Sequence, residues 1–116
     1  NMSMQYKVHI TRYAYSQMKE IRRYVEEELF APDAARKLLL TIREAIGSLQ
    51  DLPLRHQLLD EEPWKTEGVR RLPVKNFYVY YWTDEEKKQV HVTAVVYGKR
   101  DQVKQLENME MDCRTF

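Results

Sequence analysis

The chain has few residues that cross-link a fold or interrupt its regular elements. It has one cysteine, Cys113, and three glycines in 116 residues, which excludes an internal disulfide and a zinc site built from several thiolates. Its formal net charge is only +1, so any attraction of nucleic acid must come from a local basic patch. No run approaches the roughly 18 apolar residues of a membrane-spanning helix, and the N-terminus lacks a signal-peptide pattern. We therefore expect a cytoplasmic protein without membrane contact.

The composition is that of a globular protein. Hydrophobic residues make up 43% and charged residues 32% of the chain, which suits a buried core beneath a charged surface. The length is enough for one core and too short for two. We expect a single domain over residues 1–116, with an ordered core over 5–107 and a frayed tail over 108–116.

The second half of the chain predicts three strands. The runs 69–75, 76–83 and 89–97 are dense in β-branched and aromatic residues. The polar segment 84–88 should form a hairpin turn between the last two. A further short strand is predicted at the N-terminus, where Tyr6, Val8 and Ile10 alternate with polar residues, and there we expect His9 to be solvated or hydrogen-bonded.

Two helices are predicted between the first strand and the others. Thr11 is a candidate N-cap, and apolar residues recur every three or four positions over 14–29. Pro32 ends this helix and suits the first turn of a second one, whose apolar stripe covers 35–49. The short joint makes the helices an antiparallel hairpin. The fold class is α+β: an N-terminal strand and the helix hairpin packed on a small, mostly antiparallel sheet.

The segment 51–68 lacks sustained periodicity and is predicted as a loop. Trp64 within it either plugs the edge of the core, the role that we favour, or contacts a partner. His56 and the carboxylates at 60–62 follow no recognised ligand spacing, so no metal is expected. A short helix or turn is predicted at 101–107.

Basic residues cluster around the predicted strands. Some precede the central strand and others follow the last one, so neighbouring strands can bring them onto one surface suited to phosphate. Solvated strand ends without a function are the alternative interpretation. The residues are Arg70, Arg71, Lys75, Lys99 and Arg100.

The order of elements and three motifs together resemble the RelE/ParE superfamily of bacterial toxins. The resemblance covers Tyr6 to Leu106, and Pro32-Asp33-Ala34-Ala35 is similar to the ParE and plasmid-stabilisation branch. The motifs are Arg70-Arg71-Leu72, Asn76-Phe77-Tyr78-Val79-Tyr80-Tyr81 and Val95-Val96-Tyr97-Gly98-Lys99-Arg100. The resemblance also places Phe77, Val79 and Tyr81 on the inner face of the sheet.

The resemblance implies a growth-inhibiting toxin of a type II toxin–antitoxin module, neutralised by a cognate antitoxin on the sheet and its neighbouring helix surface. Two targets stay open. The RelE branch cleaves mRNA on the ribosome without metal, whereas the ParE branch inhibits DNA gyrase by binding. An alternative is a non-toxic binding or regulatory module, for example a homodimer. No cofactor is expected in any of these cases.

The resemblance also implies functional residues. Cleavage by attack of a ribose 2′-OH on phosphate needs a base, an acid and cations. Tyr78 stands where the RelE branch has an arginine, and Gln105-Leu106 replaces its C-terminal tyrosine or histidine–tyrosine pair, which favours gyrase. If the protein is an enzyme, the predicted catalytic residues are Arg71, Tyr78 and Arg100; Arg70, Lys75, Tyr97 and Lys99 are predicted to contact nucleic acid or another target.

Overall fold

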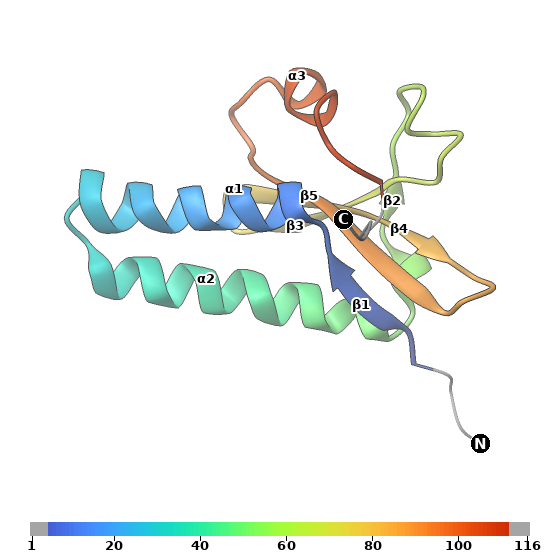
Figure 1. Ribbon diagram of the computed structural model, residues 1–116, viewed down its shortest axis with the longest axis horizontal. Coiled ribbons are helices and arrows are strands. Elements are labelled where there is room, and N and C mark those ends of the chain that lie inside the picture. The colour runs from blue at the N-terminus through green and yellow to red at the C-terminus, as the bar shows by residue number, and fades with distance from the viewer. Residues whose placement is uncertain (1–4, 112–116) are drawn as a thin grey trace.

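The computed structural model describes residues 5–111. Among these residues five strands form one mixed sheet in the order β1-β5-β4-β3-β2 (Figure 1). β1 is parallel to β5, and the other neighbouring pairs are antiparallel. This confirms the predicted α+β class. The strands are β1 (Lys7–Ile10), β2 (Gln57–Leu58), β3 (Arg70–Val74), β4 (Phe77–Asp84) and β5 (Gln89–Tyr97).

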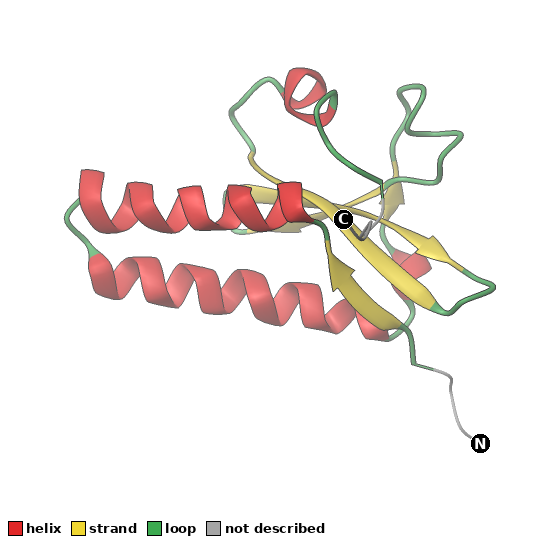
Figure 2. Ribbon diagram, viewed as in Figure 1, coloured by secondary structure: helices red, strands yellow, loops and turns green. Residues whose placement is uncertain are grey.

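An antiparallel helix hairpin packs on one face of the sheet, and its joint end reaches beyond the sheet (Figure 2). Thr11 is the N-cap of the first helix, as predicted, because its side-chain oxygen accepts from the Ala14 N–H. Pro32 begins the second helix, also as predicted. No helix within residues 5–111 is long and apolar enough to cross a membrane. The helices are α1 (Arg12–Arg23), its π-helical continuation η1 (Tyr24–Glu28) and α2 (Pro32–Gly47).

The π-helical turn is a departure from the predicted regular helix. In it, the Leu29 N–H donates to the Tyr24 carbonyl at 3.1 Å, so one extra residue enters the helical turn. The apolar stripe is displaced by this insertion, and Leu29 is 54% exposed instead of buried. The end of the hairpin consequently presents apolar side chains to solvent.

The main core lies between the helix hairpin and the facing side of the sheet. Ile42 of α2 and Val79 and Tyr81 of β4 are fully buried there. Phe77 packs against the same cluster, which confirms the predicted inner set of β4. Removal of this apolar surface from water is the main stabilising term of the fold.

The opposite face of the sheet carries a second apolar cluster. It is covered by the segment 59–69 and by a short helix, α3 (Gln102–Leu106). Trp64 is 7% exposed and packs with Leu106 and Tyr80. The favoured structural role of Trp64 is therefore confirmed.

The tail is in part ordered by this second cluster. Met109 and Met111 pack against it, and the Trp82 indole N–H donates to the Met111 carbonyl. The predicted frayed tail begins at 108, and the contacts of these two methionines with the cluster were not expected from the sequence, because isolated methionines form no periodic pattern. The remainder of the predicted tail, including Cys113, lies outside the described residues.

Two further details differ from the prediction. The segment predicted as a loop contains the short strand β2. Two short 3₁₀ turns flank the start of this segment, η2 (Ser48–Gln50) and η3 (Pro53–Arg55). His9 is not a solvated imidazole: its ring stacks on His91 with centroids 5.5 Å apart. Its Nε2 is buried without a hydrogen-bond partner among residues 5–111.

Candidate target-binding surface

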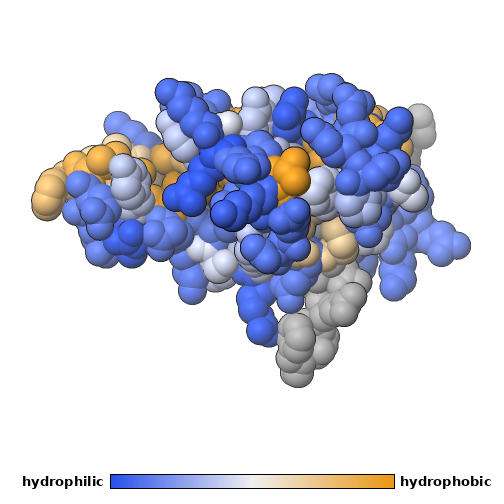
Figure 3. Space-filling view, turned by 90° about the horizontal axis from the view of Figure 1, so that it is seen from above, coloured by the Kyte–Doolittle hydropathy of each residue, from blue (hydrophilic) through white to orange (hydrophobic). Residues whose placement is uncertain are grey.

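A groove of about 770 Å³ opens where the far half of α1 and η1 meets the ends of β4 and β5. Its floor is apolar, with Ile21 and Val25 on the helix side and Phe77 on the sheet side. We call it the hairpin groove. The adjoining end of the helix hairpin forms a hydrophobic patch, seen at the left of Figure 3, where Leu29 is 54% and Phe30 is 87% exposed. Large exposed apolar surfaces of this kind mark interaction sites.

A turn after β5 brings basic side chains to the mouth of the hairpin groove. The Arg100 N–H donates to the Tyr97 carbonyl at 3.0 Å, and Tyr97, Lys99 and Arg100 all line the groove. The Gln102 side-chain amide fixes this turn by donating to the carbonyls of Tyr97 and Arg100, at 2.9 and 2.8 Å. Its Oε1 accepts from the Tyr80 hydroxyl at 2.6 Å. Three of the seven predicted site residues therefore lie together.

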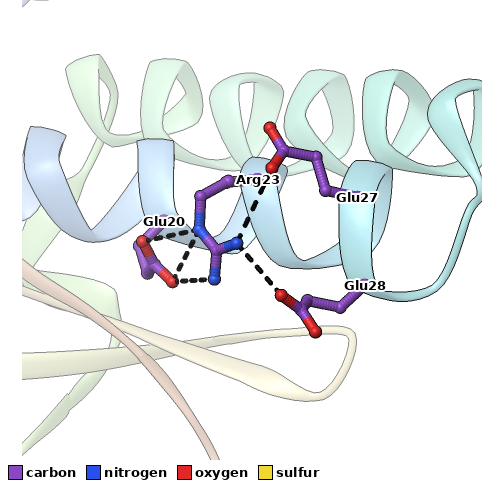
Figure 4. A network of polar contacts seen from close by, with 4 residues as sticks. All are labelled: Glu20, Arg23, Glu27 and Glu28. Atoms are coloured by element: carbon purple, nitrogen blue, oxygen red, sulfur yellow. Dashed lines mark hydrogen bonds and ion pairs between the residues drawn. The ribbon is translucent and has the colours of Figure 1, made fainter.

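An acidic side chain faces these cations. Glu20 lines the hairpin groove, and Arg23 Nη2 donates to Glu20 Oε2 at 2.7 Å. The same guanidinium lies 3.8 Å from Glu27 and 3.3 Å from Glu28 (Figure 4). The hydrogen bond from Arg23 lowers the pKa of Glu20 below its ordinary value, and the charges of Arg23 and Arg100 add to this effect. Glu20 is thus firmly anionic, and the mouth of the groove carries both signs of charge.

Arg71 and Tyr78 meet on the face of the sheet opposite the helices. The guanidinium carbon of Arg71 lies 4.4 Å from the centroid of the Tyr78 ring, a cation–π contact. Gly98 packs against the same ring: a Cβ added there would lie 3.3 Å from Tyr78 Cε2 and 3.1 Å from the Asn76 carbonyl oxygen. The Tyr78 ring therefore contacts both Arg71 and the start of the turn that carries Lys99 and Arg100.

The last two predicted residues have other surroundings. Arg70 is the cross-strand partner of Tyr81 and so lies on the helix side of the sheet. Its Nη1 donates to the His56 carbonyl at 2.9 Å, which ties the preceding loop to β3. Lys75 is exposed in the turn between β3 and β4, with a left-handed φ of 55°. The structure therefore separates Arg70 from Arg71 although they are neighbours in sequence.

Neither a metal centre nor a histidine base is formed at this surface by the described residues. Among residues 5–111 no three His, Cys, Asp or Glu side chains are grouped to hold a metal ion. His56 lies edge-on to the Tyr81 ring, with centroids 6.2 Å apart. Burial lowers the pKa of His56 below its ordinary value, and the Arg55 charge lowers it further. This histidine is therefore neutral near pH 7 and belongs to the packing beneath the loop.

The sequence interpretation missed Glu20 and Gln102. The Glu20–Arg23 spacing indicates an ion pair along a helix, yet nothing in it shows that Glu20 faces the turn after β5. Gln102 follows the basic pair without any motif. Both residues owe their roles to contacts between elements that are distant in the chain, so periodicity could not identify them.

Comparison with known proteins gives two kinds of match. The family model described as the ParE toxin of the type II toxin–antitoxin system parDE matches residues 8–102. The chromosomal ParDE toxin–antitoxin system from P. aeruginosa is a similar solved structure, with a TM-score of 0.67, 21% identity, and coverage of 82% of this chain and 98% of that chain.

A second similar structure is the toxin–antitoxin complex RelBE2 from Mycobacterium tuberculosis. It has a TM-score of 0.57 and 20% identity, with coverage of 80% of this chain and 98% of that chain. At these identities the structural likeness establishes the fold. No curated protein sequence matches this chain.

Proposed function

Because this chain belongs to the ParE toxin family of type II toxin–antitoxin systems, we propose that it inhibits growth by binding DNA gyrase and that a cognate antitoxin neutralises it. The observation that carries this proposal is the hairpin groove, with its apolar floor and charged mouth. An apolar centre with a polar rim is the usual anatomy of a protein-binding surface. Inhibition by binding requires no reacting group.

The placement of the predicted catalytic residues supports binding over cleavage. RNA cleavage needs a base, an acid and cations gathered about one phosphate. Arg71 is engaged on the Tyr78 ring, whereas Arg100 borders the groove with Glu20, whose negative charge opposes a phosphate there. Burial raises the pKa of Tyr80 above its ordinary value, so its hydroxyl keeps its proton and is a poor base.

The C-terminal positions also support binding. In the resemblance to the RelE branch, Gln105 and Leu106 stand where an acid–base tyrosine is expected. Leu106 is 3% exposed in the second cluster. The Gln105 carbonyl accepts from the Tyr13 hydroxyl at 2.7 Å. Leu106 thus holds α3 against the sheet and Gln105 ties it to α1; neither side chain is an acid or a base.

A gyrase assay tests the proposal directly. The purified protein should inhibit DNA supercoiling, and its induction in cells should produce gyrase-dependent DNA breaks. The double substitution Lys99→Ala with Arg100→Ala should weaken inhibition about tenfold, since charged groups at a rim govern association. Arg43→Ala, which removes an exposed arginine from α2, is the matched control and should leave inhibition unchanged. Absence of both supercoiling inhibition and DNA breaks would refute gyrase as the target.

A second function, metal-independent and ribosome-dependent mRNA cleavage, is favoured by the contacts of Tyr78. Its ring touches Arg71 and lies against Gly98, at the start of the turn that carries Arg100, so a phosphate bound near it would meet Arg71, with Tyr78 supplying an acid or base. Primer extension on translated mRNA after induction tests this. Cuts at A-site codons that disappear in Arg100→Ala would establish cleavage. Tyr78→Phe separates the roles of the ring and the hydroxyl, because it keeps the surface on which Arg71 stacks.

Antitoxin binding belongs, in this proposal, to the hairpin groove. A partner that covers Phe77 and Ile21 would bury apolar surface and mask the cations at the mouth. Co-expression of the cognate antitoxin should restore growth, and the antitoxin should co-purify with the chain. Ile21→Arg places a charge on the groove floor and should prevent co-purification of the antitoxin, whereas Arg43→Ala should not. Co-purification with Ile21→Arg to the same extent as with the unaltered chain would place the antitoxin elsewhere.

A non-toxic regulatory module is the remaining alternative. The exposed side chains of Phe30 and Leu29 favour it, because they suit self-association as a homodimer. Normal growth during expression of folded protein without antitoxin would support this alternative. Sedimentation would then show whether the chain is a dimer, and Phe30→Ser should abolish the dimer if the hairpin end forms the interface.

A further inference from the structure

A second pocket lies on the other side of α3 from the hairpin groove. It has a volume of about 440 Å³ and opens between the 61–67 turn and α3, two segments that rise from the same side of the sheet in Figure 1. Gln105 lines the groove and Leu106 lines the pocket, so α3 separates the two cavities. The apolar lining of the second pocket consists of Pro63, Trp64, Val103, Leu106, Met109 and Met111.

Hydrogen bonds within each wall fix the shape of this pocket. In the turn, the Lys65 N–H donates to the Glu61 carbonyl at 2.8 Å and the Val69 N–H to the Trp64 carbonyl at 3.0 Å. On the other wall, the Asp101 carboxylate caps α3 by accepting from a backbone N–H at 3.2 Å. Trp64 is held at 7% exposure between the walls. The cavity is therefore formed before any ligand arrives, as small binding sites usually are.

Four glutamates surround the apolar lining, and we call the site the acidic pocket. Glu62 is used within the turn, where its Oε1 accepts from the Thr66 N–H at 3.0 Å. Glu61, Glu67 and Glu107 are exposed, and none of the ion pairs within residues 5–111 involves them. The whole chain has a net charge of +1, so this group of carboxylates is a local feature of the pocket.

The arrangement of the carboxylates indicates which class of ligand the acidic pocket can bind. Within the described part of the chain they are not grouped as metal ligands; instead they stand around an apolar floor. A phosphate would be repelled by them. Viewed from the side of α3, the surface is mostly hydrophilic with a small hydrophobic patch among polar residues (Figure 3). A ligand that combines positive charge with apolar bulk fits both features.

We propose that the acidic pocket binds a basic, partly apolar peptide segment of a partner protein. An aliphatic or aromatic side chain of the segment packs on Trp64 and on Met109 and Met111, whose flexible thioethers adapt to varied shapes. Lysine or arginine side chains next to it meet Glu67 and Glu107 at the rim. This surface goes beyond the proposed function, because it lies across α3 from the groove and remains open when the groove is occupied.

Peptide binding to the full chain tests the proposal. The probe is a fluorescein-labelled peptide of alternating arginine and leucine, with one comparison peptide carrying glutamate for arginine and another carrying serine for leucine. We expect binding, measured by fluorescence anisotropy, only for the first peptide, and weaker binding as salt is raised. In an NMR titration the indole N–H signal of Trp64 should shift on addition of this peptide.

Charge variants locate the binding without disturbing the core. Glu67→Gln combined with Glu107→Gln should weaken binding about fivefold, the sum expected for two exposed ion pairs. The matched control is Glu44→Gln with Glu86→Gln, which makes the same change of charge at exposed sites on α2 and on the β4–β5 turn. Equal affinities of the two double variants, or binding of the glutamate peptide, would overturn the proposal.

Another occupant would give a distinct result. Concentration-dependent dimerisation that disappears in the Glu67→Gln, Glu107→Gln variant would assign the pocket to a second copy of this chain and overturn the proposal. This result does not bear on gyrase inhibition, so failure here is distinguishable from failure of the proposed function.

Discussion

The two faces of the sheet are closed by different kinds of structure. The helix face is covered by α1 and α2, two long helices with regular apolar stripes. The other face is covered by an irregular loop, a five-residue helix and two isolated methionines. On the helix face, the apolar side chains that recur at helical spacing along α1 and α2 pack against the sheet. The second face holds Arg71 on Tyr78 and both walls of the acidic pocket, so the irregular side also carries polar groups available for binding.

The largest expected effect is the loss of stability when a side chain of the main core is truncated. Ile42→Ala removes a side chain with no exposed surface between α2 and the sheet, and neighbours on two long elements cannot close the cavity. We expect a loss of about 2–5 kcal/mol in the free energy of unfolding, measured by urea denaturation. Leu40→Ala on the same helix removes a side chain that is 55% exposed and should cost less than about 1 kcal/mol. Similar losses for the two variants would contradict the assignment of the main core.

Leu106→Ala makes the matching change on the second face. Leu106 is 3% exposed, but α3 is short and bordered by adaptable methionines, so the site can partly collapse. We expect a loss of about 2 kcal/mol in the free energy of unfolding, the lower end of the range for a buried leucine. Near-ultraviolet circular dichroism should also change, because the packing around Trp64 loosens. A loss larger than that of Ile42→Ala would reverse the ranking of the two faces.

Gly98→Ala probes the contact between the second face and the basic turn. The added Cβ would lie 3.1 Å from the Asn76 carbonyl oxygen and 3.3 Å from the Tyr78 ring, both tight. We expect a cost of about 1–2 kcal/mol from overpacking. A double-mutant cycle with Tyr78→Ala isolates the contribution of the ring, since that substitution relieves one of the two contacts. Additive losses in the cycle would show that the Tyr78 ring does not restrain the turn.

The regular parts of this molecule were accessible from the sequence and the irregular parts were not. Thr11, Pro32 and the alternation of Phe77, Val79 and Tyr81 follow from capping, proline geometry and the two-residue period of a strand. β2 has two residues, too few to show any period. Gln102 and Met109 act through single contacts with distant elements, which no local pattern records.

The sequence predicts part of the arrangement of the candidate residues, and their function stays a prediction. Tyr97 ends β5 and Lys99 and Arg100 follow it, and all three line one groove, as neighbours in sequence can. Arg70 and Arg71 were grouped together, but successive residues of a strand point to opposite faces, and Arg70 binds the His56 carbonyl on the helix side. The presence of Glu20 beside the cations depends on how α1 crosses the sheet, which composition and spacing do not determine.

The smallest expected effect is the pH dependence that His56, packed against Tyr81 on the helix face, gives to the stability of the fold. In the folded chain burial, and then the Arg55 charge, lower the pKa of His56. The unfolded imidazole, with a pKa of about 6.5, therefore binds protons at higher pH than the folded one. The resulting stability is fully present above the unfolded pKa and is lost as pH falls from there toward the folded pKa.

The measurement is the urea midpoint of the unaltered chain and of His56→Gln between about pH 5 and 8. The unaltered chain should lose more stability on acidification than the variant. Because His56→Gln changes no other titratable group, the difference between the two profiles reports on His56. Parallel pH profiles would mean that burial of the His56 imidazole against the helix face contributes nothing to the acid sensitivity of this fold.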